Sequence, residues 1–163
     1  MEIHDLGEAQ IIVLRLSLAL LVGIVLGLNR WLHHKAAGIR THSLVAIGSA
    51  VAILMVSNGE SVEELAARSR VLQGLVAGIG FLGAGVILHD ATSQKIHGLT
   101  TAASIWACAL LGAVFGAGQY LIGIMALAAI LLVLLVGGRL ERSTRVLLGV
   151  KRESEVPADD SET

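Results

Sequence analysis

The sequence is poor in the residues that soluble folds and chemical sites usually need. It has one cysteine, one proline and 3 % aromatic residues, and 15 % of its residues are charged, against about 25 % in ordinary soluble domains. A single cysteine, Cys108, excludes an intrachain disulfide framework and a multi-cysteine metal site. Because no basic stripe is interleaved with aromatic residues, we expect no nucleic-acid partner.

Aliphatic residues and glycine dominate what is present. The hydrophobic fraction is 55 % of 163 residues, with 19 glycines, and the mean hydropathy is +0.78. A soluble domain of this length cannot bury so much aliphatic surface, so the composition indicates a membrane protein with the lipid bilayer as its surroundings. The acidic start, MEIHDLGEAQ, lacks the positive region of a secretory signal peptide. We therefore expect the first apolar segment to remain in the mature protein.

Five apolar segments are predicted to form transmembrane helices. Each has about 16–18 residues, near the lower limit for crossing about 30 Å of hydrocarbon. Strands are not expected in these segments, because hydrophobic alternation is absent and open sheet edges cannot cross a bilayer. The prediction is an all-α polytopic bundle over residues 11–138, between a polar N-terminus (1–10) and a basic juxtamembrane segment with a disordered acidic tail (139–163). The five segments are Ile11–Leu28, Thr41–Val56, Val71–Leu88, Leu99–Phe115 and Tyr120–Gly137.

The distribution of basic residues predicts the orientation of the bundle. With the N-terminus outside, three basic residues lie on the outer side, namely Arg15, Arg68 and Arg70. The other nine basic residues then lie on the inner side, and this excess fits the positive-inside rule for an N-out, C-in arrangement. Arg15, near the outer end of the first segment, is expected to snorkel to the interface, with Glu8 as a candidate partner. The nine on the inner side would be Arg30, Lys35, Arg40, Lys95, Arg139, Arg142, Arg145, Lys151 and Arg152.

Residues 78–83 read G-x-G-x-x-G, the pattern of a dinucleotide-binding turn. Such a turn follows a strand, opens a helix and has an acidic residue about 20 positions later. Here the glycines lie within a continuous apolar run, and the position 20 residues after Gly83 is Ala103. The pattern therefore does not indicate a nucleotide site, and no cofactor is expected.

The same glycines are better explained by helix packing. At about 100° per residue, Gly74, Gly78 and Gly85 share one helix face, and Gly80 and Gly83 lie on the opposite side. Gly74 and Gly78 also form a small-xxx-small pair, which allows close approach of helices in lipid. We predict that this helix is the buried centre of the bundle, and that exposed small-residue faces support a homodimer or another homo-oligomer.

Three blocks carry a family resemblance: AGIRTHSLVAIGSA (37–50), GIGFLGAGVI (78–87) and GLTTAASIWACALLGAVFGAG (98–118). Together with GLNR (27–30), they resemble the MgtC/SapB family of bacterial inner-membrane proteins over roughly residues 11–137. The resemblance implies a multi-pass protein of the inner membrane, linked to adaptation to low magnesium and to virulence. It also implies a regulatory role through binding another membrane protein, such as the membrane sector of F-type ATP synthase.

The chain departs from that family in two respects. Many members carry an ACT-like domain after the membrane helices, and this chain is expected to be a short form without it. Asn29 stands where many members have an acidic residue, which puts an electrostatic role of that position in doubt.

A polar cluster is predicted at the inner ends of the helices. Arg40 and Asp90 could pair across this inner mouth, whereas the alternative is that the basic residues only anchor the chain at the interface. Thr100, Thr101 and the nearby Ser104 either line a cavity or cap and cross-link helices. The candidate functional residues are Asn29, Arg30, Arg40, Thr41, His42, Asp90, Thr100 and Thr101.

A magnesium or other cation transporter, or a channel subunit, is the alternative function. Magnesium is held by oxygen ligands that usually include carboxylates, and cation pores use rings of acidic side chains or backbone carbonyls. None of the five apolar segments contains Asp or Glu. The sequence therefore favours a binding module over a pore.

Catalytic and metal sites are not expected. The sequence has no H-E-x-x-H or G-x-S-x-G motif and no paired acids, so no enzymatic activity is predicted. His33 and His34 are adjacent and cannot share a helix face, so they do not indicate a metal site. Cys108, surrounded by alanines, is expected to be a packing residue.

Overall fold

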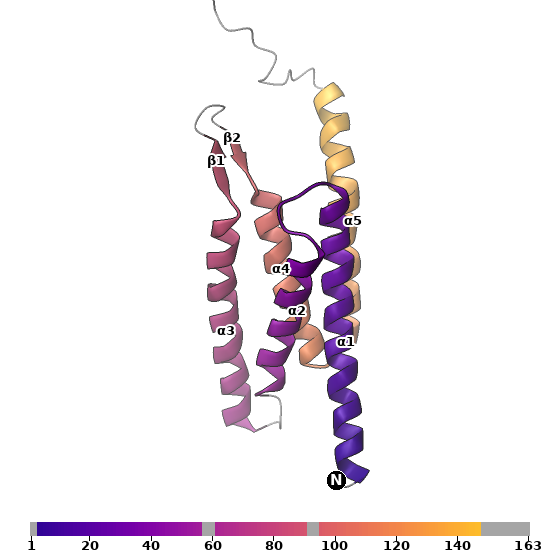
Figure 1. Ribbon diagram of the computed structural model, residues 1–163, viewed down its shortest axis with the longest axis vertical. Helices are drawn as coiled ribbons and strands as arrows, with labels where there is room; N and C mark the ends of the chain where they lie inside the picture. The colour runs from indigo at the N-terminus through magenta and orange to yellow at the C-terminus, as the bar shows by residue number, and fades with distance from the viewer. Residues whose placement is uncertain (1–2, 57–60, 91–94, 148–163) are drawn as a thin grey trace, which may run out of the picture.

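The computed structural model describes residues 3–56, 61–90 and 95–147, and the side chains at 7–56, 61–87, 96–138, 140 and 143. The described chain forms a bundle of five helices with one short hairpin (Figure 1), which confirms the all-α prediction. The elements are α1 (Ile3–Leu32), α2 (Ile39–Leu54), α3 (Val62–Gly85), β1 (Leu88–Asp90), β2 (Lys95–His97), α4 (Leu99–Gly116) and α5 (Tyr120–Leu147).

The core of the bundle is formed by α1, α2 and α4. Helix α4 is the most enclosed span, with 56 % of its most apolar window buried, against 6 % for α3. The prediction that the glycine-rich helix α3 is the buried centre is therefore wrong. Helix α3 lies at one edge of the bundle (Figure 1), where it packs mainly against α4. Its glycines occupy two faces, and within the described residues only the face of Gly83 has a neighbour.

Close approach of α1 to α2 depends on Gly23 and Gly27. A Cβ atom at Gly23 would collide with the backbone of Ser43, and one at Gly27 would lie 2.5 Å from the Cα of Ile39. The two glycines are one turn apart, so α2 lies directly on the α1 backbone over this turn. This is the small-xxx-small geometry that packs helices in lipid.

The contact between α4 and α2 repeats this arrangement. A Cβ atom at Gly112 would collide with the carbonyl of Ala46, and one at Gly116 would lie 2.7 Å from the carbonyl oxygen of Ala50. Both Ala46 and Ala50 are fully buried. Helix α2 is therefore held between two glycine pairs, one from α1 and one from α4.

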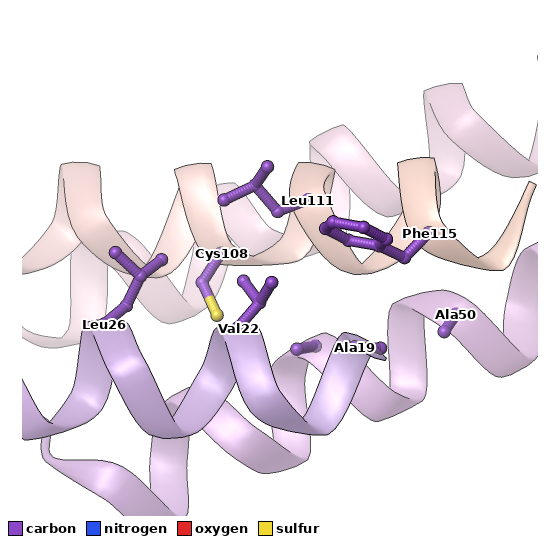
Figure 2. Packing of buried hydrophobic residues seen from close by; sticks show 8 residues of the cluster. Ala19, Val22, Leu26, Ala50, Cys108, Leu111 and Phe115 are labelled. Carbon is purple, nitrogen blue, oxygen red and sulfur yellow. The ribbon is translucent and has the colours of Figure 1, made fainter. Parts of the chain in front are cut away.

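Larger side chains fill the space around these close contacts. Cys108 is fully buried and donates an S–H bond to the backbone oxygen of His42 at 3.2 Å, so it packs and cross-links α4 to α2. Figure 2 shows the cluster between α1, α2 and α4: Ala19, Val22, Leu26, Ala50, Cys108, Leu111 and Phe115.

Four described helices are long and apolar enough to cross a membrane: 7–32, 62–85, 99–116 and 120–138. Helix α2 has 16 residues and rises only about 24 Å, less than the hydrocarbon thickness. Together with the family evidence given below, these spans identify a membrane protein. The count of five crossings and the N-out orientation stay predictions.

Several element boundaries differ from the predicted segments. Helix α1 begins at Ile3 rather than at Ile11, so the polar N-terminal residues are part of the helix. Helix α3 begins at Val62, where Ser61 and Glu64 form a capping box, the standard start signal of a helix. Helix α5 continues to Leu147 rather than ending near Gly137. The acidic tail predicted to be disordered, residues 153–163, falls outside the described residues.

The connection between α3 and α4 contains a hairpin that the sequence did not predict. Leu88 pairs with His97 and Asp90 with Lys95 in antiparallel register. The apolar pattern was read as helix to Leu88, whereas α3 ends at Gly85. The run of residues 86–88 is too short for periodicity to separate helix from strand.

Candidate functional site

The predicted polar residues divide into a buried group and an exposed group. Asn29 and Arg30 end α1, His42 lies in the first turn of α2, and Thr101 lies in the first turn of α4; all four are buried. Three more, Arg40, Thr41 and Thr100, are exposed. Asp90 lies in β1, but its side chain is outside the described residues. We call Arg30, His42, Thr101 and Ser104 the buried polar cluster.

Arg30 connects α1 to the start of α4. Its Nη2 donates to Thr101 Oγ1 at 2.8 Å, a buried hydrogen bond. The side chain is 5 % exposed, and its Nε has no hydrogen-bond partner. Burying an unpartnered donor on a charged group costs free energy, so we expect the buried guanidinium to have a structural or binding role.

His42 connects α2 to α4. Its Nδ1 lies 2.9 Å from the Gly38 oxygen, and its Nε2 lies 3.1 Å from Ser104 Oγ. A carbonyl can only accept, so Nδ1 carries a proton and donates to Gly38. The Ser104 hydroxyl donates to the Thr101 backbone oxygen at 2.8 Å. Because it has a single proton, it can donate to Nε2 of a neutral ring only in place of that bond. The cluster thus runs without a gap from α2 through α4 to Arg30.

The structure does not test the predicted pairing of Arg40 with Asp90. Arg40 is exposed, and the Asp90 side chain is outside the described residues, so this pairing stays a prediction. His33, also exposed, places its Nδ1 2.7 Å from the oxygen of Asn29. Within the described parts of the chain, no three His, Cys, Asp or Glu side chains lie close enough to hold a metal ion.

The sequence reasoning missed the role of Arg15. Its Nη1 donates to the Gly116 oxygen at the end of α4, at 3.1 Å, a contact that was not predicted, whereas snorkelling stays a prediction. A cation at a helix C-terminus is favourable, because the last carbonyls lack partners and carry partial negative charge. The G-x-G of residues 116–118 was the available signal, since it marks the end of a helix next to a turn.

The buried polar cluster consists mainly of hydrogen-bond donors. It contains a guanidinium, an imidazole and two hydroxyl groups, and no carboxylate. Hydroxyl and carbonyl oxygens remain, but they lie around a fixed positive charge, which repels a divalent cation. The arrangement suits cross-linking of helices or contact with an anion better than coordination of magnesium.

Comparison with known proteins fits this architecture. The sequence profile of the MgtC family matches residues 16–143. The chain belongs to the MgtC family. The predicted resemblance is thus confirmed. Protein SrpB of Synechococcus elongatus is 46 % identical over 137 residues, covering 78 % of this chain and 75 % of SrpB. No solved structure matches.

Two further relatives are longer than the region they share with this chain. YhiD of Escherichia coli K12, provisionally named a magnesium transporter, is 40 % identical over 127 residues, covering 75 % of this chain and 58 % of YhiD. Protein MgtC of Salmonella typhimurium LT2 is 41 % identical over 110 residues, covering 66 % of this chain and 44 % of MgtC. The chain therefore spans about half the length of these two relatives.

Proposed function

We propose that this MgtC family member is a multi-pass protein of the bacterial inner membrane that acts by binding other membrane proteins during adaptation to low magnesium. Family membership supports the link to magnesium adaptation and virulence. The nature of the buried polar cluster supports binding over ion conduction, because it presents a positive charge at the end of the bundle. No catalytic role is part of this proposal.

The observation that carries the proposal is the outward face of α3. Gly74, Gly78 and Gly85 lie on this face, and a Cβ atom at any of them would meet nothing within 4 Å. Between them Phe81 is 82 % exposed. The opposite face of α3 meets the bundle, where Ile79 is buried and Gly83 would place a Cβ 3.6 Å from that of Ala102.

Helix α5 shows what a lipid-facing surface looks like in the same molecule. Its exposed side chains are large and aliphatic, among them Leu121, Leu132 and Val133, each more than 60 % exposed. Glycine offers lipid little contact but allows another helix to approach closely. We therefore propose that the α3 face receives a helix of a second copy or of a partner, with the membrane sector of F-type ATP synthase as the candidate that the resemblance suggests.

Photo-crosslinking from native membranes tests this proposal. A crosslinking amino acid at Phe81 of α3 should capture a discrete set of proteins, either a second copy or subunits of a partner. The same amino acid at Leu132, on the aliphatic face of α5, is the matched control and should capture lipid. Equal capture at both positions, or none at Phe81, would contradict the proposal.

Transport remains the second candidate function, because the relative YhiD is provisionally named a magnesium transporter. Reconstituted protein should pass no more magnesium than protein-free vesicles, since the apolar segments carry no acidic residue. Magnesium flux that is lost on Asp90→Ala would favour transport and overturn the binding proposal.

A further inference from the structure

Arg30 is a buried cation with no described counter-ion. It is 5 % exposed, its Nη2 binds a neutral hydroxyl, and its Nε is unpartnered. The carboxylates among the described side chains are Glu8, near the start of α1, and Glu63 and Glu64, in the first turn of α3. Both helix starts lie at the opposite end of the bundle (Figure 1), so none of these groups neutralises Arg30.

Two helices begin beside this cation without a cap. The N-cap residues of α2 and α4 are Gly38 and Gly98, neither start has a side-chain cap, and neither first turn has an acidic residue. Helix α3 contrasts with both, because Ser61 and Glu64 cap it. The first N–H groups of a helix lack intrahelical partners and carry partial positive charge. The uncapped starts of α2 and α4 thus add to the positive potential around Arg30.

Contacts within the bundle fix both helix starts next to Arg30. Thr101, in the first turn of α4, accepts directly from the guanidinium. A Cβ atom at Gly27, one turn before Arg30, would lie 2.9 Å from the Gly38 oxygen, which places the start of α2 against the same end of α1. Exposed basic and hydroxylic residues around this end include Lys35, Arg40, Thr41 and Thr100, beside exposed apolar residues such as Trp31, Leu32 and Leu99.

We propose that Arg30 and the starts of α2 and α4 bind a phosphate group, carried either by an anionic lipid headgroup or by free phosphate. A guanidinium donates two parallel hydrogen bonds to phosphate oxygens, and helix N-termini bind phosphate through free N–H groups. Arg30 lies two residues before Leu32, the end of the apolar span, so we expect the site near the membrane interface.

The test uses the full chain purified in a neutral detergent. Thermal unfolding is followed with inorganic phosphate against chloride at equal ionic strength, and in mixed micelles with phosphatidylglycerol against phosphatidylcholine. We expect the wild type to be stabilised by the phosphate-bearing anion and not by its control. Arg30→Met should abolish this response, and Arg30→Lys should raise the half-maximal concentration about tenfold, because lysine lacks the fork of donors.

The matched control is Arg70→Met, which removes an exposed arginine near the start of α3 and should leave the response unchanged. A response to both probes supports phosphate chemistry in general; phosphatidylglycerol alone identifies the headgroup, and inorganic phosphate alone identifies the free ion. Absence of any response, or an equal response in Arg30→Met, would overturn the proposal.

Arg30→Met also keeps the test interpretable, because an apolar replacement of a buried charge is tolerated where it leaves no buried counter-ion unpaired. Asp90→Asn then separates the phosphate site from an internal ion pair. If Asp90 were the counter-ion, Asp90→Asn would destabilise the wild type but not Arg30→Met, and that coupling would contradict the proposal. Additive effects of the two substitutions support it.

Discussion

Two serine hydroxyls in the core differ in their hydrogen bonding, and this difference predicts opposite effects of the same substitution. Ser104 Oγ lies within hydrogen-bond distance of both His42 Nε2 and the Thr101 oxygen. The buried Ser43 Oγ has no hydrogen-bond partner in the described part of the chain. Ser104→Ala should therefore lower the free energy of unfolding by about 1–3 kcal/mol, because it leaves a buried imidazole nitrogen unsatisfied. Ser43→Ala should be neutral or stabilising by up to about 1 kcal/mol.

Denaturant unfolding in detergent micelles measures both serine variants against the wild type. Each substitution removes one oxygen from the same residue type, so loss of volume is matched between them. Equal destabilisation of the two variants would contradict the hydrogen-bond network assigned to His42. Unchanged stability in Ser104→Ala would do so as well.

Arg15 provides a second prediction from a single contact. Its Nη1 donates to the Gly116 oxygen, which ties α1 to the end of α4. Arg15→Met keeps most of the apolar stem and removes the charged donor, so we expect a loss of about 1–2 kcal/mol in the free energy of unfolding. Arg70→Met, at an exposed arginine, should change stability by less than about 0.5 kcal/mol. Similar effects of the two substitutions would contradict a stabilising role of Arg15 at the C-terminal end of α4.

At the scale of elements, glycines with and without neighbours should respond differently to alanine. A methyl group at Gly112 would collide with the Ala46 carbonyl, whereas one at Gly78 would meet nothing within 4 Å among the described residues. Gly112→Ala should cost about 1–3 kcal/mol or more, because the α2 and α4 backbones must separate. Gly78→Ala should leave the single chain stable or raise its stability by up to about 1 kcal/mol, the difference in helix propensity.

Unfolding and oligomeric state are measured on the same samples, because the two positions report different contacts. A loss of assembly in Gly78→Ala without loss of stability would place a second helix on the outward face of α3. Tolerance of Gly112→Ala would show that α2 and α4 do not approach as closely as described here.

The sequence pattern predicted helix faces well and their neighbours poorly. Helical geometry separated Gly74, Gly78 and Gly85 from Gly80 and Gly83. Of the latter pair, Gly83 meets α4 at Ala102, whereas a Cβ atom at Gly80 would meet nothing within 4 Å in the described chain. It could not tell which face has a neighbour inside the chain, because glycine permits close approach without specifying a partner. The glycine pair of α1, Gly23 and Gly27, carries the same small-xxx-small signal and packs against α2.

The predicted polar residues at the start of α2 show, within a single helix turn, the same limit of prediction from sequence. Arg40, Thr41 and His42 are consecutive and were grouped as one block, but only His42 is buried. Neighbouring residues on a helix are rotated by about 100°, so a block of three cannot share one environment. The periodicity of α2 indicates the buried side, since Ala46 and Ala50 follow His42 at intervals of four. Its bond to Ser104 depends on tertiary packing that the sequence alone does not fix.

At the scale of the whole molecule, the two ends of the bundle differ in charge. The end that holds Glu8, Glu63 and Glu64 also carries Arg68 and Arg70, whereas the opposite end presents Arg30, Lys35 and Arg40 without a described carboxylate. This asymmetry agrees with the distribution that predicted an N-out, C-in orientation. The predicted orientation would place the proposed phosphate site on the cytoplasmic side, where anionic lipids attract basic segments.

Thiol labelling in intact cells tests that orientation. The protein has one cysteine, Cys108, which is fully buried, so the wild type should not react with a membrane-impermeant reagent and serves as the background control. Glu63→Cys, exposed in the first turn of α3, should react in intact cells. Lys35→Cys, exposed between α1 and α2, should react only after permeabilisation. Reversed labelling would show that the bundle has the opposite orientation. The site around Arg30 would then face the outer leaflet, and the positive-inside rule would no longer explain its charge.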